Sequence, residues 1–389
     1  MEPITVLHLI SSLSSGGAER QLANLICSTS REAVNHTVCT INDSGFFAQQ
    51  IRDAGYEVID LGIGQKRPFL RASVAFRRIL KEKKPDIIHS WLYDANIAAR
   101  LARLAHTKIP LVTSLQLADY EPDAARIGNW NPHKVKALKT IDRFTAWLTD
   151  PHFVACSKFV SESYIRYFGM RRDRAEVILN SFDPNFLRMS DRSLADLSNE
   201  LGLPVDSFIY LNVGRLDPQK NQKTIIEAFR RVAEKIPNAY LLLVGKGSIE
   251  SDLRKLAVDS GFGNRILFLG RRKDIGDLLE LADVFVFPSF FEGLPVALIE
   301  AMFKRLPCIA SNMEVFQEVI VNHETGLLVN PNSAEDLSGC MLNLHDDSNL
   351  RRRLGESAYM HSSSHFSVRV TAEKWEALYS KVAAYYRDS

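Results

Sequence analysis

Short apolar runs and longer amphipathic stretches alternate along most of the chain. Runs rich in β-branched and aromatic residues are typical of strands buried in a parallel sheet, and the amphipathic stretches are typical of the helices that connect such strands. For the first half of the chain we predict strands at residues 4–10, 35–40, 57–61, 86–89, 111–114 and 152–155. Intervening helices are predicted at 18–28, 69–83 and 95–105.

A second series of the same kind predicts strands at 208–213, 239–244, 266–269, 284–287 and 308–311, with helices at 221–235, 249–260 and 274–281. Between the two series lies a polar stretch, 184–204, which is typical of a linker. The stretch 368–386 has apolar residues near helical spacing and predicts a final helix. The pattern therefore predicts an α/β fold with two domains, 1–187 and 188–365.

Composition narrows the classes of function. The net charge of +2 on 389 residues gives no general attraction to nucleic acid, and we expect no nucleic-acid partner. The five cysteines are scattered and form no CxxC pair, which favours a reducing compartment. The sequence opens in a predicted strand rather than a signal peptide, and no apolar run is long enough to span a membrane. We expect a cytoplasmic protein, soluble or peripheral on the inner face of a membrane.

The segment 290–302 carries the most informative chemistry. Glu292 lies in a turn after the predicted strand 284–287, and Glu300 lies eight residues later in a predicted helix that Pro295 helps to start. Free N–H groups at a helix start attract phosphates, and carboxylates accept hydrogen bonds from sugar and ribose hydroxyls. The segment therefore favours a nucleotide-sugar ligand. The structural alternative is that Glu292 caps the helix and Glu300 lies on a solvated face.

Two other loops follow predicted strands. Gly16 and Gly17 come after the first strand, where glycines let the backbone approach a ligand closely. Gly214, Arg215 and Lys220 follow the first strand of the second half, and their cations are suited to phosphate oxygens. An ordinary tight turn and a solvated basic loop are the structural alternatives.

These segments resemble three signatures of the retaining glycosyltransferases of family 4: the E-x7-E motif, the Gly-Gly-Ala-Glu-Arg first loop and the G-R-L-x-x-x-K-N loop. The resemblance implies the GT-B fold, an α/β arrangement of two Rossmann-like domains facing across a cleft. In that fold the last helix, about 366–389 here, crosses back onto the first domain. The resemblance also implies a hexosyltransferase-type enzyme. Such an enzyme moves a sugar from a nucleotide diphosphate sugar to a hydroxyl of a glycan or lipid-linked oligosaccharide in polysaccharide or lipopolysaccharide biosynthesis. The expected donor is a UDP-sugar.

The resemblance assigns roles to individual residues. Arg215 and Lys220 match its diphosphate-binding pair, Glu292 would face the donor sugar, and these three are the predicted catalytic residues. Glu300 would bind the ribose hydroxyls. The complete predicted donor-binding set is Gly16, Gly17, Gly214, Arg215, Lys220, Gly245, Arg271, Glu292, Gly293, Leu294, Pro295 and Glu300.

The predicted acceptor residues are His89, Trp91, Tyr93 and Asp94. Many relatives have a His-x-His at this place, and here Trp91 stands at the second histidine, where a large aromatic ring can pack on a sugar face. His89 is either a site residue or a satisfied structural histidine. Asp94 either meets the acceptor or caps a helix that begins at residue 95.

No Asp-x-Asp motif stands at a strand end, so we expect neither a metal nor another cofactor. Two segments that mix basic and aromatic residues, 66–81 and 159–174, are candidates for contact with an anionic membrane, or are ordinary amphipathic helices. Two other functions stay open for this fold: a catalytically silent protein that binds a glycan or nucleotide, and an epimerase of UDP-amino sugars.

Overall fold

A computed structural model describes residues 2–14, 16–64, 68–105, 109–122, 127, 131–187 and 191–387. The chain divides into two compact units. Unit 1 comprises Met1–Ser181 together with Val368–Ser389, and unit 2 comprises Phe182–Ser367. The sequence predicted these boundaries at 187 and near 366.

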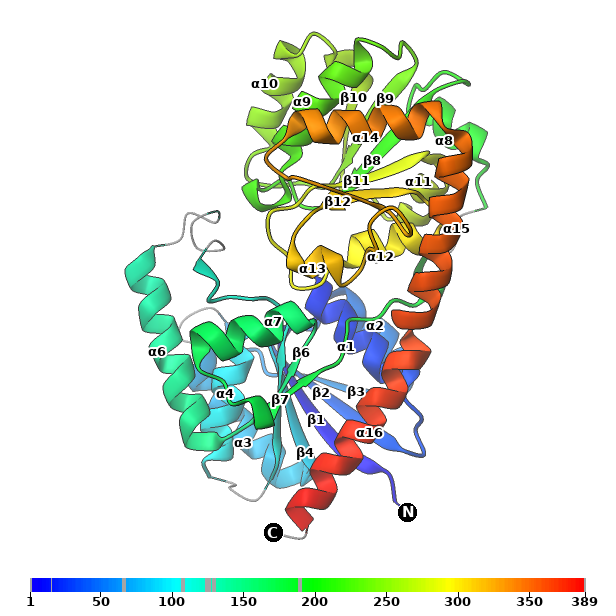
Figure 1. The fold of residues 1–389 in the computed structure, drawn as a ribbon. Helices are drawn as coiled ribbons and strands as arrows, with labels where there is room; N and C mark the ends of the chain where they lie inside the picture. The colour runs from blue at the N-terminus through cyan, green and yellow to red at the C-terminus, as the bar shows by residue number, and fades with distance from the viewer. Residues whose placement is uncertain are drawn as a thin grey trace. The chain divides into compact units, whose positions relative to one another are not determined.

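Unit 1 contains a seven-stranded parallel sheet in the order β3-β2-β1-β4-β5-β6-β7 (Figure 1). Its strands are β1 (Ile4–Ser12), β2 (Val34–Asp43), β3 (Glu57–Asp60), β4 (Ile87–Trp91), β5 (Leu111–Leu115), β6 (His152–Ala155) and β7 (Ala175–Val177). Its longer helices are α1 (Gly17–Ser28), α2 (Gly45–Asp53), α3 (Pro68–Lys83), α4 (Tyr93–Arg103), α6 (Pro132–Thr149) and α16 (Val368–Arg387). Short helices follow β6: α7 (Lys158–Ser163), a π-helix (Tyr164–Phe168) and a 3₁₀ turn (Arg172–Arg174).

The two faces of this sheet are covered by different helices because side chains alternate along a strand. Leu7 and Leu9 of β1 lie in a core with Phe76 and Leu80 of α3 and with alanines of α4. His8, between them, faces the other way, toward the side where α16 contacts β1 and β4. The helix at the end of the chain therefore belongs to the first unit, as predicted.

Unit 2 contains a six-stranded parallel sheet in the order β10-β9-β8-β11-β12-β13. Its strands are β8 (Phe208–Val213), β9 (Ala239–Val244), β10 (Ile266–Gly270), β11 (Val284–Phe287), β12 (Cys308–Ser311) and β13 (Leu327–Val329). Its helices include α8 (Leu194–Glu200), α9 (Gln222–Ala233), α10 (Glu250–Asp259), α11 (Ile275–Leu281), α12 (Val296–Phe303), α13 (Glu314–Gln317), α14 (Ala334–Asp346) and α15 (Ser348–His365). The 3₁₀ turn Pro218–Lys220 precedes α9.

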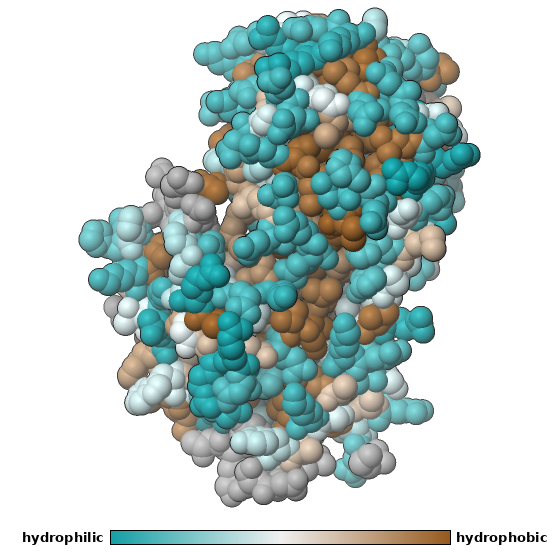
Figure 2. Space-filling model, viewed as in Figure 1, coloured by the Kyte–Doolittle hydropathy of each residue, from teal (hydrophilic) through white to brown (hydrophobic). Residues whose placement is uncertain are grey.

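The predicted α/β fold class is confirmed by these two parallel sheets. The sequence did not predict β7 and β13, each only three residues long, because such strands are too short for a recognisable apolar run. Hydrophilic residues cover much of the face seen in Figure 2, and hydrophobic residues show between them. Within the described ranges, no helix combines the length and apolar character needed to cross a membrane.

The strand order reverses once in each sheet, between β1 and β4 in unit 1 and between β8 and β11 in unit 2. In open α/β sheets, ligands bind outside the carboxyl ends of the strands at such a switch point, because the connections there leave in opposite directions. The loops that follow these four strands are therefore the expected ligand-binding positions.

Candidate active site

Two loops of unit 2 meet at the switch point of its sheet. Residues 214–221 follow β8 and residues 288–295 follow β11, the strand beside it. The ammonium of Lys220 lies 2.5 Å from Oε1 of Glu292. The amide of Gln219 donates from Nε2 to the carbonyl of Phe291 at 2.5 Å. The structure thus brings together Lys220 and Glu292, two predicted site residues that are 72 positions apart.

The charges in these loops differ in exposure. The side chains of Lys220 and Glu292 are only 14% and 9% exposed, so each depends on the other for neutralisation. The side chain of Arg215 is 71% exposed, and its Nη1 lies 3.2 Å from Oδ2 of Asp217. One cation is therefore fixed inside the site, while the other extends from the same loop into solvent.

Close backbone contacts join the ends of three strands here. Gly245, at the end of β9, has φ of +139°, and a Cβ atom on it would lie 1.9 Å from the carbonyl oxygen of Gly214. Its N–H donates to the carbonyl of Gly270, at the end of β10, at 2.8 Å. Arg271, the next residue, is exposed. A side chain at Gly245 would separate these strand ends, so this predicted position requires glycine.

The helix that follows β11 supplies the second acid. Pro295 is the residue just before α12, so it precedes the helix rather than lying in its first turn. Glu300 is 5% exposed within α12, and Glu292 is 7% exposed. The alternative that placed Glu300 on a solvated face is therefore wrong. Gly293 and Leu294 are buried between the two acids.

Sequence reasoning assigned no role to two residues that hold these loops. Besides Gln219, Asn221 lies in the left-handed region with φ of +57°, and its Nδ2 donates to the carbonyls of Pro288 at 3.0 Å and Pro331 at 2.7 Å. Asparagine tolerates this conformation better than most residues. An asparagine directly after Lys220 and just before a helix was the available signal.

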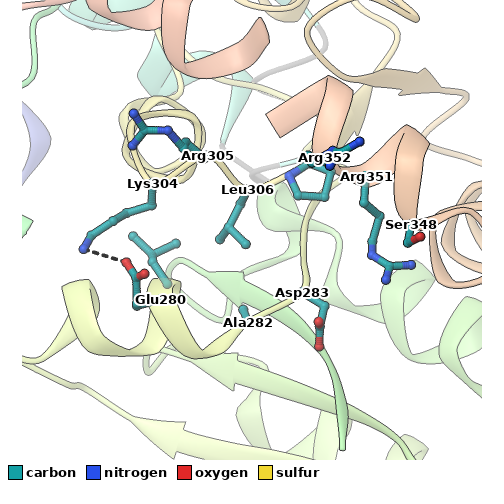
Figure 3. A pocket seen from close by; sticks show the side chains of 11 residues that line it. Glu280, Ala282, Asp283, Lys304, Arg305, Leu306, Ser348, Arg351 and Arg352 are labelled. Carbon is teal, nitrogen blue, oxygen red and sulfur yellow. Dashed lines mark hydrogen bonds and ion pairs between the residues drawn. The ribbon is translucent and has the colours of Figure 1, made fainter. Parts of the chain in front are cut away.

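A pocket of about 310 Å³ in unit 2 lies at the opposite ends of the strands from these loops (Figure 3). Its lining includes Asp283 and Pro307, which immediately precede β11 and β12. Lys304 pairs with Glu280 at 3.1 Å, and Arg351 donates to backbone carbonyls at the end of α14. Because it lies at the amino ends of the strands, this pocket is not the candidate donor site.

In unit 1, the loop after β1 leads into α1. Gly16 is the residue before the helix and Gly17 is its first residue, one position before the predicted start. The carboxylate of Glu19 lies over this helix end, since a Cβ atom on Gly16 would be 2.0 Å from its Oε2. Burial raises the pKa of Glu19. An acidic side chain therefore lies against the backbone at the start of this helix.

A second pocket of about 310 Å³ lies at the carboxyl ends of β1, β4 and β5 in unit 1. Leu92, directly after β4, has φ of +70°, a conformation that is strained for a side chain of this kind. Helix α4 then begins at Tyr93, which places Asp94 in its first turn. The alternative that Asp94 caps a helix starting at residue 95 is therefore wrong. Tyr93 and Asp94 both line the pocket.

The polar groups of this pocket are acidic or neutral. Burial raises the pKa of Asp119 to about 6, and its Oδ2 accepts a hydrogen bond from the hydroxyl of Tyr164 at 3.2 Å. Burial also raises the pKa of Asp94. The Oδ1 atom of Asn96 is buried with no hydrogen-bond partner among the described residues. None of the described lining residues is lysine or arginine. Sequence reasoning missed Asn96 and Asp119, which belong to no motif.

The structure does not support the predicted acceptor role of His89 and Trp91. Both are buried in the core beneath α16, and Trp91 is only 1% exposed. The Nδ1 of His89 lies 2.8 Å from the hydroxyl of Tyr379, and its Nε2 lies 2.8 Å from Oγ of Ser114. Trp91 donates from Nε1 to Nδ1 of His8 at 3.3 Å. His89 is thus a satisfied structural histidine, and Trp91 offers no ring face to an acceptor.

Among the described residues, no group of three or more histidine, cysteine or acidic side chains is arranged to hold a metal ion. Metal independence stays a prediction.

Two family models match the chain. Residues 15–186 match glycosyltransferase family 4, and residues 195–361 match glycosyl transferases group 1. The chain is 30% identical, over 285 residues, to the UDP-Gal:alpha-D-GlcNAc-diphosphoundecaprenol alpha-1,3-galactosyltransferase of Escherichia coli, covering 72% of this chain and 71% of that one. It is 31% identical, over 333 residues, to the putative glycosyltransferase EpsD of Bacillus subtilis, covering 81% and 83%.

Solved structures share the fold. HepE from Anabaena, in complex with UDP and glucose, matches with a TM-score of 0.81 at 21% identity and covers 97% of this chain and 100% of its own. WaaG, a glycosyltransferase involved in lipopolysaccharide biosynthesis, matches with a TM-score of 0.75 at 17% identity, covering 96% and 99%. With both units matched by family models and relatives aligned over most of its length, the chain belongs to glycosyltransferase family 4 and is a glycosyltransferase of the GT-B fold.

Proposed function

We propose that this glycosyltransferase moves a hexose from a UDP-sugar to a hydroxyl of a glycan or lipid-linked oligosaccharide, with retention at the anomeric carbon. The observation that carries the donor half is the pairing of Lys220 with Glu292 at the switch point, beside the exposed Arg215. The galactosyltransferase relative, whose name specifies UDP-galactose, supports a UDP-sugar donor. A relative from Rhizobium meliloti named for lipopolysaccharide core biosynthesis supports a glycan acceptor.

The cations act on the leaving group. A UDP leaving group gains negative charge as the bond from its oxygen to the sugar breaks, and fixed positive charges stabilise that charge. Lys220 is held in place by Glu292, so it needs little reorganisation when the diphosphate arrives. Arg215, exposed on the same loop, closes on the phosphate oxygens. Glu300 in α12 accepts hydrogen bonds from the ribose hydroxyls.

Retention follows without a covalent enzyme intermediate. The acceptor oxygen forms its bond to the anomeric carbon on the face from which the diphosphate leaves, and the acceptor proton passes to the departing phosphate oxygen. Glu292, which pairs with Lys220, orients the donor sugar in this proposal and does not attack it.

The first test is calorimetric titration with UDP, GDP and ADP, followed by turnover assays with the matching sugar donors. Arg215→Ala should lower kcat at least about a hundredfold, because it removes a charge-assisted contact made to the leaving group. The melting temperature should not change, because the side chain is mostly exposed.

Arg231→Ala, at an exposed position on α9, is the matched control and should keep full turnover. Unchanged turnover of Arg215→Ala would contradict its assignment. Tight UDP binding without sugar transfer to any acceptor would instead favour a catalytically silent protein.

We also propose that the pocket of unit 1 receives the terminal sugar of the acceptor. Its carboxylates and amides accept and donate hydrogen bonds to hydroxyls, and the absence of lysine and arginine from its described lining disfavours a phosphate there. Asp94→Asn should raise the KM for the acceptor about tenfold while leaving UDP affinity unchanged. Asp53→Asn, at an exposed position on α2, is the control. A parallel loss of UDP affinity would contradict the acceptor assignment.

A further inference from the structure

Helix α6 has its polarity reversed relative to an ordinary surface helix. Its buried residues are mostly polar: Asp142, Thr145, Ala146 and Thr149. It also exposes four large hydrophobic side chains, which we call the apolar ridge: Ile141, Phe144, Trp147 and Leu148. A helix that hides polar groups and exposes apolar ones is not explained by packing within its own unit.

Hydrogen bonds fix this orientation. The guanidinium of Arg100, on α4, is buried and forms an ion pair with the carboxylate of Asp142. It also donates to the carbonyl of Asp142 at 3.1 Å and to Oγ1 of Thr145 at 3.3 Å. Arg103 donates from Nη1 to the carbonyl of Thr149 at 2.6 Å. Turning the ridge inward would bury apolar groups but break all of these bonds, so the ridge stays exposed.

The ridge is pronounced. Trp147 is 76% exposed and Phe144 is 58% exposed. Their rings stack with centroids 6.2 Å apart at 29°, so they form a continuous aromatic surface. Adjoining exposed apolar side chains mark a surface that binds a partner, such as a protein or a membrane.

The charges on α6 indicate the kind of partner that this surface binds. Lys134, Lys136 and Arg143 are exposed on this helix, whereas its one acid, Asp142, is buried against Arg100. The exposed surface of α6 is therefore basic as well as aromatic. Tryptophan and phenylalanine favour the boundary between lipid headgroups and acyl chains, and lysine and arginine favour anionic headgroups.

The two segments predicted from sequence to meet a membrane have a different character. Phe76 is buried in the core under α3, and Tyr164 and Phe168 are buried in unit 1. Arg171 and Arg172 pair with the acids Asp173 and Glu162. Lys66 and Arg67 lie outside the described residues. The mixture of basic and aromatic residues did not reveal which side chains turn inward. Leu70 and Val74 of α3 are exposed, but no aromatic side chain is exposed in the described parts of these two segments.

We propose that α6 is the membrane-docking element of this protein and that its occupant is an anionic lipid bilayer. The apolar ridge enters the headgroup boundary, while Lys134, Lys136 and Arg143 contact the anionic headgroups. This proposal stands apart from the donor chemistry, because none of these residues belongs to the donor loops or lines the acceptor pocket. Docking would bring the enzyme to lipid-linked acceptors.

Vesicle sedimentation tests the proposal with the full chain. Wild type should bind vesicles of phosphatidylcholine with about a third phosphatidylglycerol, and should bind pure phosphatidylcholine far more weakly. Raising the salt to about 0.5 M should weaken binding to the anionic vesicles. The double variant Phe144→Ser/Trp147→Ser should lose at least about tenfold in affinity.

Val258→Ser/Met360→Ser removes two exposed apolar side chains elsewhere, on α10 and α15, and should leave vesicle binding unchanged. Both double variants should keep donor turnover with a soluble acceptor, which verifies folding. Tryptophan emission should shift to the blue on vesicles, and Trp147→Phe should lose that shift while retaining binding.

Three results would overturn the proposal. Wild type that stays in the supernatant with anionic vesicles at low salt excludes docking. Equal loss in both double variants excludes a specific role for α6. A concentration-dependent dimer that Phe144→Ser/Trp147→Ser abolishes would assign the ridge to a second copy of the chain instead.

Discussion

Three histidines lie side by side in the core of unit 1, on the sheet face beneath α16. Nε2 of His8 lies 2.9 Å from Nδ1 of His36, whose Nε2 lies 2.8 Å from Oγ1 of Thr29. The rings of His8 and His89 are 5.1 Å apart. Burial lowers the pKa of all three, to about 3 for His36, and the neighbouring imidazoles lower those of His8 and His89 further. The folded protein therefore holds them neutral.

This cluster predicts how stability depends on pH. Unfolding releases histidines with ordinary pKa values near 6.5, so below that pH the unfolded state binds more protons than the folded state. The stability contributed by neutral burial is complete above pH 6.5 and falls as the pH drops, by up to about 1.4 kcal/mol per pH unit for each histidine. Urea unfolding at pH 7.5, 6.5 and 5.5 measures the slope. His36→Gln should reduce it by about one proton, and an unchanged slope would contradict this account.

Residue-level prediction was most informative where a motif fixed both the residue and its place at a strand end. Lys220 and Glu292 were predicted from separate loops and meet. The prediction failed for Trp91, because the sequence does not show which face of β4 is covered by α16. Asp119 was missed because a lone acid after a strand has no sequence signature.

At the scale of elements, the contact between α4 and α6 depends on one buried ion pair. The side chains of Arg100 and Asp142 are 1% and 7% exposed, and the hydroxyl of Tyr120 donates to Oδ2 of Asp142 at 2.6 Å. Such a pair orients α6 through direction-specific bonds rather than through apolar contact.

Asp142→Ala should destabilise the protein by about 3–5 kcal/mol, because it leaves the guanidinium of Arg100 buried without a counter-charge. Chemical denaturation followed by tryptophan fluorescence measures the loss. Arg100→Met/Asp142→Leu, which removes both charges, should recover most of it. A double variant as unstable as Asp142→Ala would show that lost hydrogen bonds to α6, rather than the unpaired charge, carry the cost.

Elements were predicted best where a buried strand is long enough to give a recognisable apolar run. The strands at 152–155, 208–213, 239–244, 284–287 and 308–311 have the predicted bounds. The reversed polarity of α6 could not be foreseen, because periodicity gives the angle between the apolar and polar sides of a helix but not which side is buried.

At the scale of the whole molecule, the chain passes between the units twice, after Ser181 and before Val368. Hydrogen bonds within each unit hold the chain beside these passages. On the unit 1 side, Gln21 and Asn24 of α1 hold the backbone of Ser181 at 2.7–3.0 Å. On the unit 2 side, Phe182 donates to the carbonyl of Phe366 at 2.7 Å and pairs with Ser367. The family resemblance predicted this return of the chain, whereas apolar patterning alone gave only a final helix.

That return has a consequence for synthesis. Residues 182–367 separate the two parts of unit 1, so the ribosome releases α16 only after all of unit 2 has been made. Until then β1 and β4 lack their contacts with α16, and His89 lacks its partner Tyr379. Unit 2 is one continuous stretch of chain, so its completion needs no residue after Ser367. Unit 1 is therefore begun first and completed last. A nascent chain that stops before Val368 contains all the loops of unit 2 but lacks the last helix of unit 1.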